Sequence, residues 1–268
     1  MSEYQCYEFL AVDKALTPKQ QRELRAISTR AEISSSRFWN EYQWGDLKAD
    51  PRELLRKYFD LHHYFANWGA QNFMIRLPAE RVEIATLKPY FSGYGAALTR
   101  SGKHVVLEFW ADDDEEPYYV DNPSEGGQLA AFVSLRRQLL QGDLRAAYLG
   151  WLAGVDRGAD DDALEPPVPA GLDRLNGALK ELSSLLGLRP SLIEAAAERS
   201  SRLKFDVKAA RDWLSQRSAP EKEKLLLRAM QDPSVSVGAE LLAGFNKTER
   251  RARVNPRTVQ QLRERAEG

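Results

Sequence analysis

Short stretches in the first 110 residues alternate between apolar and polar positions, which is the two-residue period of half-buried β-strands. Between these stretches, the pairs Thr17-Pro18 and Asp50-Pro51 place a capping side chain directly before a proline, as at the start of many helices. We expect strands at residues 4–12, 33–44, 61–68, 72–77 and 104–110. Helices are expected from residue 18 to about 28, over a short stretch after 51, and from 78 to about 87.

This order of strands and helices is typical of an α+β fold with an antiparallel or mixed sheet and helices on one face. Gly93 and Gly95 indicate a loop before the last expected strand. We place this sheet domain at residues 1–122.

Aromatic residues are concentrated in the stretch from Phe38 to Trp68, which holds nine aromatic side chains in thirty-one residues. Such a cluster forms either the centre of a core or a recognition surface. Strand alternation and helical spacing predict four core residues: Tyr42, Tyr58, Phe59 and Phe65. Three tryptophans fall on the opposite face or beside glycines at strand ends, and we predict that they contact a partner protein: Trp39, Trp44 and Trp68.

Strand patterns end near residue 128, and the composition changes to Leu, Ala, Arg and Glu, which favour helices. We therefore expect an all-α domain at residues 123–246, with one HEAT-like helical hairpin near its end at 221–245. The prolines at 166, 167 and 169 predict a stiff extended connector within it. The expected helices are 128–141, 143–155, 172–186, 190–199, 207–217, 220–231 and 234–246.

Charge is balanced over the whole chain but not along it. The formal net charge is -1, so any affinity for nucleic acid must be local. Between Ala111 and Gly127 there are seven acidic residues and no Lys or Arg, which is typical of a solvated linker. Residues 247–268 form a basic tail or a short helix after Asn255-Pro256. Its arginines are candidates for binding nucleic acid, an acidic partner or the acidic stretch itself: Arg250, Arg251, Arg253 and Arg257.

Catalytic patterns are missing from the sequence, which has no Gly-x-Ser-x-Gly motif, phosphate-binding loop or dinucleotide-binding motif. The only histidines are His62, His63 and His104. Adjacent residues on a strand point to opposite faces, so His62 and His63 do not readily chelate one ion. One of them, together with His104, would still need a third ligand. We predict no catalytic residue, metal or cofactor, and keep a metal-dependent hydrolase as a remote alternative.

The cellular compartment is indicated by cysteine use and by the N-terminus. Cys6 is the only cysteine, so no internal disulfide can form. No run of eighteen apolar residues occurs, and the first residues lack the pattern of a signal peptide. We therefore expect a cytoplasmic protein that does not contact a membrane.

Four short motifs stand out along the chain: YxFxAxD at 7–13, FxNxYxWGD at 38–46, NWG at 67–69 and PPVP at 166–169. With these motifs the chain resembles a set of uncharacterised bacterial proteins. The resemblance covers roughly residues 4–245 and implies a bacterial origin and a shared fold, without implying an activity. From the missing catalytic pattern and the aromatic density we expect a non-catalytic binding, scaffold or regulatory subunit of a bacterial complex. The alternative is a nucleic-acid-associated accessory protein, for example in a defence or CRISPR-type system, that uses the Arg-rich tail.

Overall fold

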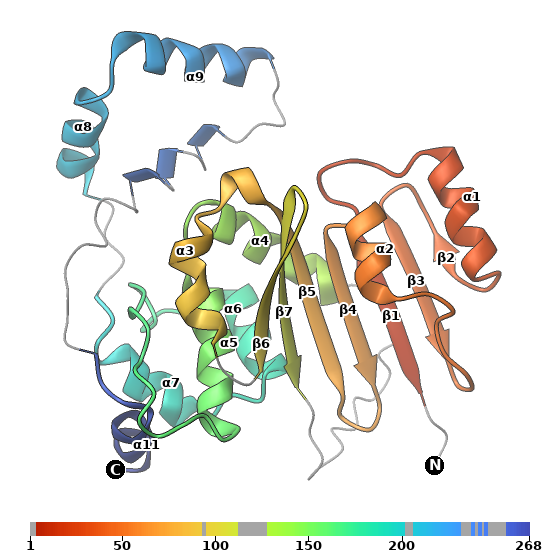
Figure 1. The fold of residues 1–268 in the computed structure, drawn as a ribbon, viewed down its shortest axis with the longest axis horizontal. Helices are drawn as coiled ribbons and strands as arrows, with labels where there is room; N and C mark the ends of the chain where they lie inside the picture. The colour runs from red at the N-terminus through yellow and green to blue at the C-terminus, as the bar shows by residue number, and fades with distance from the viewer. Residues whose placement is uncertain are drawn as a thin grey trace.

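A computed structural model of the protein describes residues 4–92, 95–111, 128–201, 206–231, 237–238, 241–242, 244–245 and 256–268. A seven-stranded sheet forms the N-terminal half, and most helices belong to the C-terminal half (Figure 1). All neighbouring strands of this sheet run antiparallel. The predicted α+β fold class is therefore confirmed.

The strand order across the sheet is β2-β3-β1-β4-β5-β7-β6. One long strand was expected at residues 33–44, but the chain turns at Ser34, whose hydroxyl accepts from the backbone N–H groups of Ser36 and Arg37. This turn divides the stretch into β2 and β3. The strands are β1 Gln5–Leu10, β2 Glu32–Ile33, β3 Arg37–Tyr42, β4 Leu61–Ala66, β5 Gln71–Pro78, β6 Ala96–Ser101 and β7 His104–Ala111.

Strand β6 was not predicted from the sequence. It begins with Ala96 and Ala97 and ends with polar residues, so it has neither β-branched enrichment nor clear alternation. It forms because a tight turn leads directly from β6 into β7, and the two strands pair antiparallel at the edge of the sheet. Gly102 has a φ of 57° in this turn, a conformation that favours glycine.

Helices α1 (Pro18–Ile27) and α2 (Pro51–Tyr58) lie over one face of the sheet (Figure 1). Both begin as predicted, α1 with a capping box on Thr17 and α2 with Asp50 accepting from the N–H of Arg52 at 2.8 Å. Under these helices, three phenylalanine rings are completely buried: Phe9, Phe38 and Phe59. This layer closes the half of the sheet formed by β1 and β3.

The opposite face of the sheet is covered by α4 (Gln128–Leu140) and α5 (Arg145–Asp156). The rings of Phe73 on β5 and Phe132 on α4 pack with their centres 4.5 Å apart. The two halves that were predicted as separate domains, divided near residue 122, therefore share one hydrophobic core.

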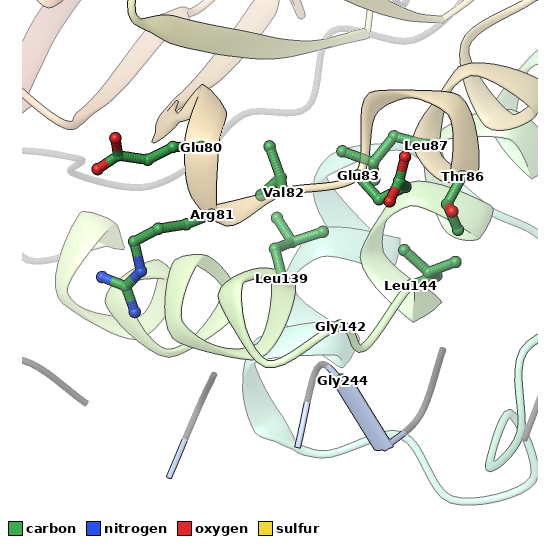
Figure 2. Close-up of a pocket in the computed structure, with 10 residues that line it drawn as sticks. All are labelled: Glu80, Arg81, Val82, Glu83, Thr86, Leu87, Leu139, Gly142, Leu144 and Gly244. Carbon is green, nitrogen blue, oxygen red and sulfur yellow. The ribbon is translucent and has the colours of Figure 1, made fainter. Parts of the chain in front are cut away.

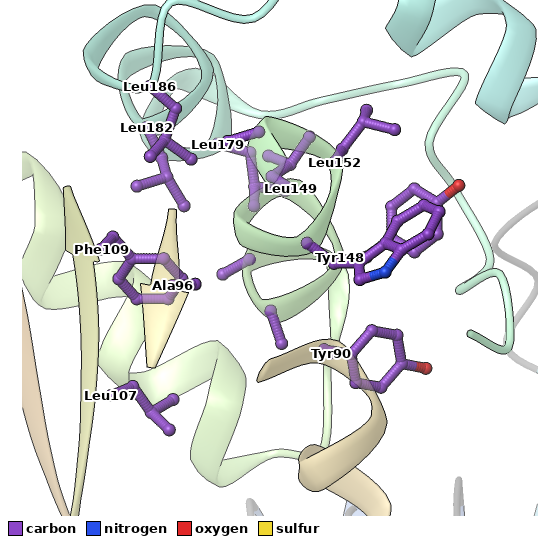
Figure 3. Close-up of a cluster of buried hydrophobic side chains, with 14 of the residues drawn as sticks. Tyr90, Ala96, Leu107, Phe109, Tyr148, Leu149, Leu152, Leu179, Leu182 and Leu186 are labelled. Carbon is purple, nitrogen blue, oxygen red and sulfur yellow. The ribbon is translucent and has the colours of Figure 1, made fainter. Parts of the chain in front are cut away.

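Helix α5 is buried along its length from Arg145 to Val155, which is typical of a central helix. Figure 3 shows Ala96 and Phe109 of the sheet facing this helix, with Leu179 and Leu182 of α6 on another of its sides. The sheet approaches α5 closely at Gly150, where an added Cβ would lie 2.5 Å from a carbon of the Phe109 ring. Gly150, which has no side chain, therefore allows α5 and the sheet to lie this close together.

None of the helices in the described ranges has the length and apolar character needed to span a bilayer. Most of the helix predicted at 234–246, and the acidic stretch after Ala111, lie outside the described residues. The elements are η1 Ala79–Arg81, α3 Ile84–Leu87, η2 Lys88–Phe91, α6 Gly177–Leu185, α7 Pro190–Ala197, α8 Val207–Ser215, α9 Ala219–Gln231 and α11 Val259–Glu267.

The end of the chain is a short helix, as one of the two predictions for residues 247–268 stated. Helix α11 is capped by Thr258 rather than by Asn255-Pro256, and it packs against α7. Its apolar residues Val259 and Leu262 are completely buried in the main core. These two side chains dock the helix on the rest of the protein.

Candidate functional site

The three tryptophans that were predicted to contact a partner differ in exposure. Trp44 is 80% exposed and Trp68 is 44% exposed, whereas Trp39 is partly covered and has the Arg37 guanidinium 5.7 Å from its ring centre. Trp44 follows β3 and Trp68 follows β4, and both strands end opposite Gln5 of β1. The structure therefore brings Trp44 and Trp68 to the same end of the sheet and keeps Trp39 apart from them.

The aromatic residues predicted for the core are mostly buried. Tyr58, Phe59 and Phe65 are at most 7% exposed. Tyr42 is partly exposed at the end of β3, where its hydroxyl accepts from the side-chain amide of Asn40 at 2.7 Å. The cluster is thus core at its centre and surface at the sheet end.

Of the four arginines proposed for nucleic acid or an acidic partner, the structure describes only Arg257. Arg250, Arg251 and Arg253 lie outside the described residues, so their role stays a prediction. Arg257 is 4% exposed, and its guanidinium donates to the carboxylate of Glu165. The structure gives Arg257 an internal role in place of the surface role predicted for it.

The histidines are placed on different parts of the sheet. His62 stacks on Phe9 beneath α2, while His63 lies against Phe132 on the opposite face, as adjacent strand residues should. His104 pairs with Pro78 at the far end of β5. Within the described residues, no three His, Cys, Asp or Glu side chains are grouped so that they could hold a metal ion.

One cavity of about 220 Å³ lies between η1, α3 and the turn from α4 to α5 (Figure 2). Its floor is apolar and includes Val82, Leu139 and Leu144. Figure 2 shows the charged groups of Glu80 and Arg81 extending away from these side chains. The other polar residues in its lining are Glu83 and Thr86, both at α3 (Figure 2). Two side chains from one short helix are a small polar set compared with the converging polar groups of most ligand sites.

An apolar surface on helix α9 has the character of a binding surface. Leu226 is 65% exposed, Leu227 is 48% exposed and Met230 is 79% exposed. At 100° per residue these positions fall within one third of the helix circumference. The inward side of α9 is formed by other residues, including the less exposed Leu225. We call Leu226, Leu227 and Met230 the α9 apolar face.

Helix α9 projects from the side of the molecule that carries α8, beyond the layer of helices that covers the sheet (Figure 1). Helix α8 contributes two further exposed apolar residues, Val207 at 60% and Leu214 at 39%. Near them, the Trp213 ring packs on Phe245, and the Arg217 guanidinium lies 4.2 Å from the centre of the Trp213 ring. None of these contacts involves Leu226, Leu227 or Met230, which stay exposed within the described part of the chain.

Sequence reasoning identified the helix but missed this face. The signal was present as three consecutive leucines at 225–227 followed by a methionine at 230. A surface helix needs only one apolar stripe to pack against the rest of the protein. Three consecutive leucines extend beyond one stripe, so at least one of them faces away from the protein. Comparison with protein-family models, curated proteins and solved structures found no match to this chain.

Proposed function

We propose that this protein is a non-catalytic binding subunit of a bacterial multiprotein complex, and that the α9 apolar face docks into an apolar groove with an acidic rim on another protein. The single observation that carries the proposal is the exposure of Leu226, Leu227 and Met230 on one side of one helix. A contiguous patch of large, exposed apolar side chains usually marks an interaction surface, whereas single exposed apolar residues are common on any protein. The proposed setting is the cytoplasm, which the single buried Cys6 supports.

The mode of binding follows from the geometry of the helix. An amphipathic helix that presents residues spaced by three or four positions inserts them into a groove of its partner. Leu226 and Met230 are one turn apart and supply the two anchors, with Leu227 beside them. The backbone of α9 is already helical, so docking costs little further backbone entropy, and this favours binding.

The charge around this face indicates the chemistry of the partner. Residues 206–231 contain six Lys or Arg and four Asp or Glu, in a chain whose net charge is -1. Lys222 and Lys224 lie on either side of the α9 apolar face by helical spacing. A groove with acidic residues at its rim would complement these lysines, which would steer the encounter and make binding weaken with salt.

The test compares the wild type with a Leu226→Gln/Met230→Gln variant. A tagged chain recovers its stoichiometric partner from native host cells, and the affinity of the two purified proteins is then measured by calorimetry at several salt concentrations. We expect the double variant to bind about 10-fold or more weakly, because central apolar anchors carry most of the binding energy. Lys222→Glu/Lys224→Glu should weaken binding and reduce its dependence on salt.

Two matched controls separate this surface from others. Val12→Gln removes an apolar side chain that is 39% exposed next to the sheet, and Leu164→Gln removes an apolar side chain that is 62% exposed before the proline-rich segment. Both should bind as the wild type does. Unchanged affinity of the Leu226/Met230 variant would overturn the proposal, as would a pure monomer with no stoichiometric partner. A homodimer that the same variant dissociates, seen by light scattering, would replace the partner with a second copy of the chain.

A further inference from the structure

A second cavity, of about 230 Å³, lies on the face of the sheet that α1 and α2 cover only in part. Four neighbouring strands supply its floor, because the register brings Tyr7 opposite Tyr64, and Met74 opposite both His62 and Glu108. Residues 50–52 at the start of α2 form one side. We call this cavity the sheet pocket.

Hydrogen bonds within the sheet pocket leave acceptors facing it. The Tyr7 hydroxyl donates its one proton to Asp46 Oδ1 at 2.5 Å, so its oxygen retains lone pairs that can accept. His62 Nδ1 lies 3.0 Å from the backbone carbonyl oxygen of Glu8. A carbonyl only accepts, so Nδ1 carries the proton and Nε2 is left with a lone pair that meets no donor among the described residues.

The protonation state of His62 agrees with this assignment. The side chain is 1% exposed, and burial lowers the pKa of His62 to about 3. The ring is therefore neutral at neutral pH and does not supply a positive charge to the sheet pocket. Its face stacks on the rings of Phe9 at 4.1 Å and Tyr7 at 6.1 Å between centres, which fixes its position.

Negative charge is concentrated at the same place. Glu108 is 9% exposed, and its carboxylate accepts from Arg52 at 2.7 and 3.0 Å and from the Asn72 amide at 2.8 Å. The sheet pocket also has Asp50 in its lining, and Asp46 holds Tyr7 behind it. Three carboxylates therefore lie at the sheet pocket, and among its lining residues only Arg52 carries a positive charge. Each carboxylate oxygen has two lone pairs, so the Glu108 carboxylate can accept further hydrogen bonds.

We propose that the sheet pocket binds a small protonated organic amine. Its N–H groups would donate to His62 Nε2, the Tyr7 hydroxyl oxygen and the Glu108 carboxylate, while its alkyl part would contact Met74. The aromatic faces of Tyr7 and Tyr64 attract a cation as well. The volume is below the range of sites for drug-sized molecules, so the ligand has few non-hydrogen atoms. This site is separate from the α9 apolar face, and neither proposal depends on the other.

Binding of three probes to the full chain tests the site: propylammonium, propanol and propionate, which share an alkyl group and differ in charge and hydrogen-bonding. Ligand-observed NMR titrations measure each dissociation constant, and the imidazole nitrogen resonances of His62 report contact at Nε2. We expect saturable binding of propylammonium alone, with a change at His62 Nε2. Tyr7→Phe and Glu108→Gln should each weaken it by about 10-fold or more, as expected for a lost charge-assisted hydrogen bond.

The matched control is Tyr58→Phe, which removes a phenol oxygen that hydrogen-bonds to Glu23 outside the sheet pocket. It should leave the dissociation constant of propylammonium unchanged. Saturable binding of propionate would show an anion site on Arg52 and overturn the proposal. Equal binding of propanol and propylammonium, the same affinity in both pocket variants as in wild type, or no saturable binding of any probe would each overturn it too.

Discussion

Arg257 and Glu165 are 92 positions apart in the sequence and form a buried, bidentate ion pair. The guanidinium Nε lies 2.9 Å from Glu165 Oε2, and Nη2 lies 3.1 Å from Oε1. Nη2 also donates to the backbone oxygen of Ala195 at 2.9 Å. On the other side, the Tyr148 hydroxyl donates to Glu165 Oε1 at 2.5 Å. The pair thus connects the central helix α5, the proline-rich segment, α7 and the start of α11.

Arg257→Met should lower the free energy of unfolding by about 3–5 kcal/mol, because it leaves the carboxylate of Glu165 buried without its cation. Urea unfolding at neutral pH measures this change. The double variant Glu165→Gln/Arg257→Met removes both charges. Its loss in the free energy of unfolding should be clearly smaller than the summed losses of Glu165→Gln and Arg257→Met alone. A single variant as stable as the wild type would show that the ion pair does not hold the segments together.

The sequence could predict the elements whose signals are local. The caps at Thr17 and Asp50 formed as expected, because a side chain that bonds its own helix needs no distant partner. Strand β6 could not be predicted in this way, since its pairing with β7 outweighs its weak propensity. The burial of Arg257 was equally hidden, because its partner Glu165 lies in another predicted region and charge alone gives no pairing.

The candidate sites show the same division. Trp44 and Trp68 stand beside glycines at strand ends, a local pattern, and both are exposed as predicted. The sheet pocket takes residues from four strands, which only the register of the sheet brings together. Single residues such as Tyr7 and Glu108 look like ordinary strand positions in the sequence. The α9 apolar face lies between these cases, since its leucine run is local but its exposure depends on the fold.

Gly150→Ala should lower the free energy of unfolding by about 1–3 kcal/mol, the usual cost of overpacking a core. The added methyl group would lie 2.5 Å from the Phe109 ring, so either α5 or the sheet must move. Gly177→Ala is the matched control: Gly177 has open space around the Cβ position at the start of α6, and the change should be neutral or slightly stabilising. Thermal and urea unfolding compare them. Equal stability of both variants would contradict the close contact.

His62 and His63 should make the stability of the protein fall as the pH is lowered from about 7 to 5. Burial lowers the pKa of His62 to about 3 and the pKa of His63 to about 4, whereas both titrate near 6.5 in an unfolded chain. Below about pH 6.5 the unfolded state therefore binds protons that the folded state does not, so this stability is complete above that pH and is lost as the pH falls.

Each of these two histidines should contribute a slope approaching about 1.4 kcal/mol per pH unit near pH 5, as measured by urea unfolding between pH 7 and 5. This range lies above the usual titration of carboxylates, so their contribution is small. His63→Phe keeps a ring against Phe132 and removes one titrating group, and it should remove about half of the slope. A wild-type stability that is independent of pH in this range, or NMR titration of both rings near 6.5, would show that the two imidazoles are not buried in neutral form.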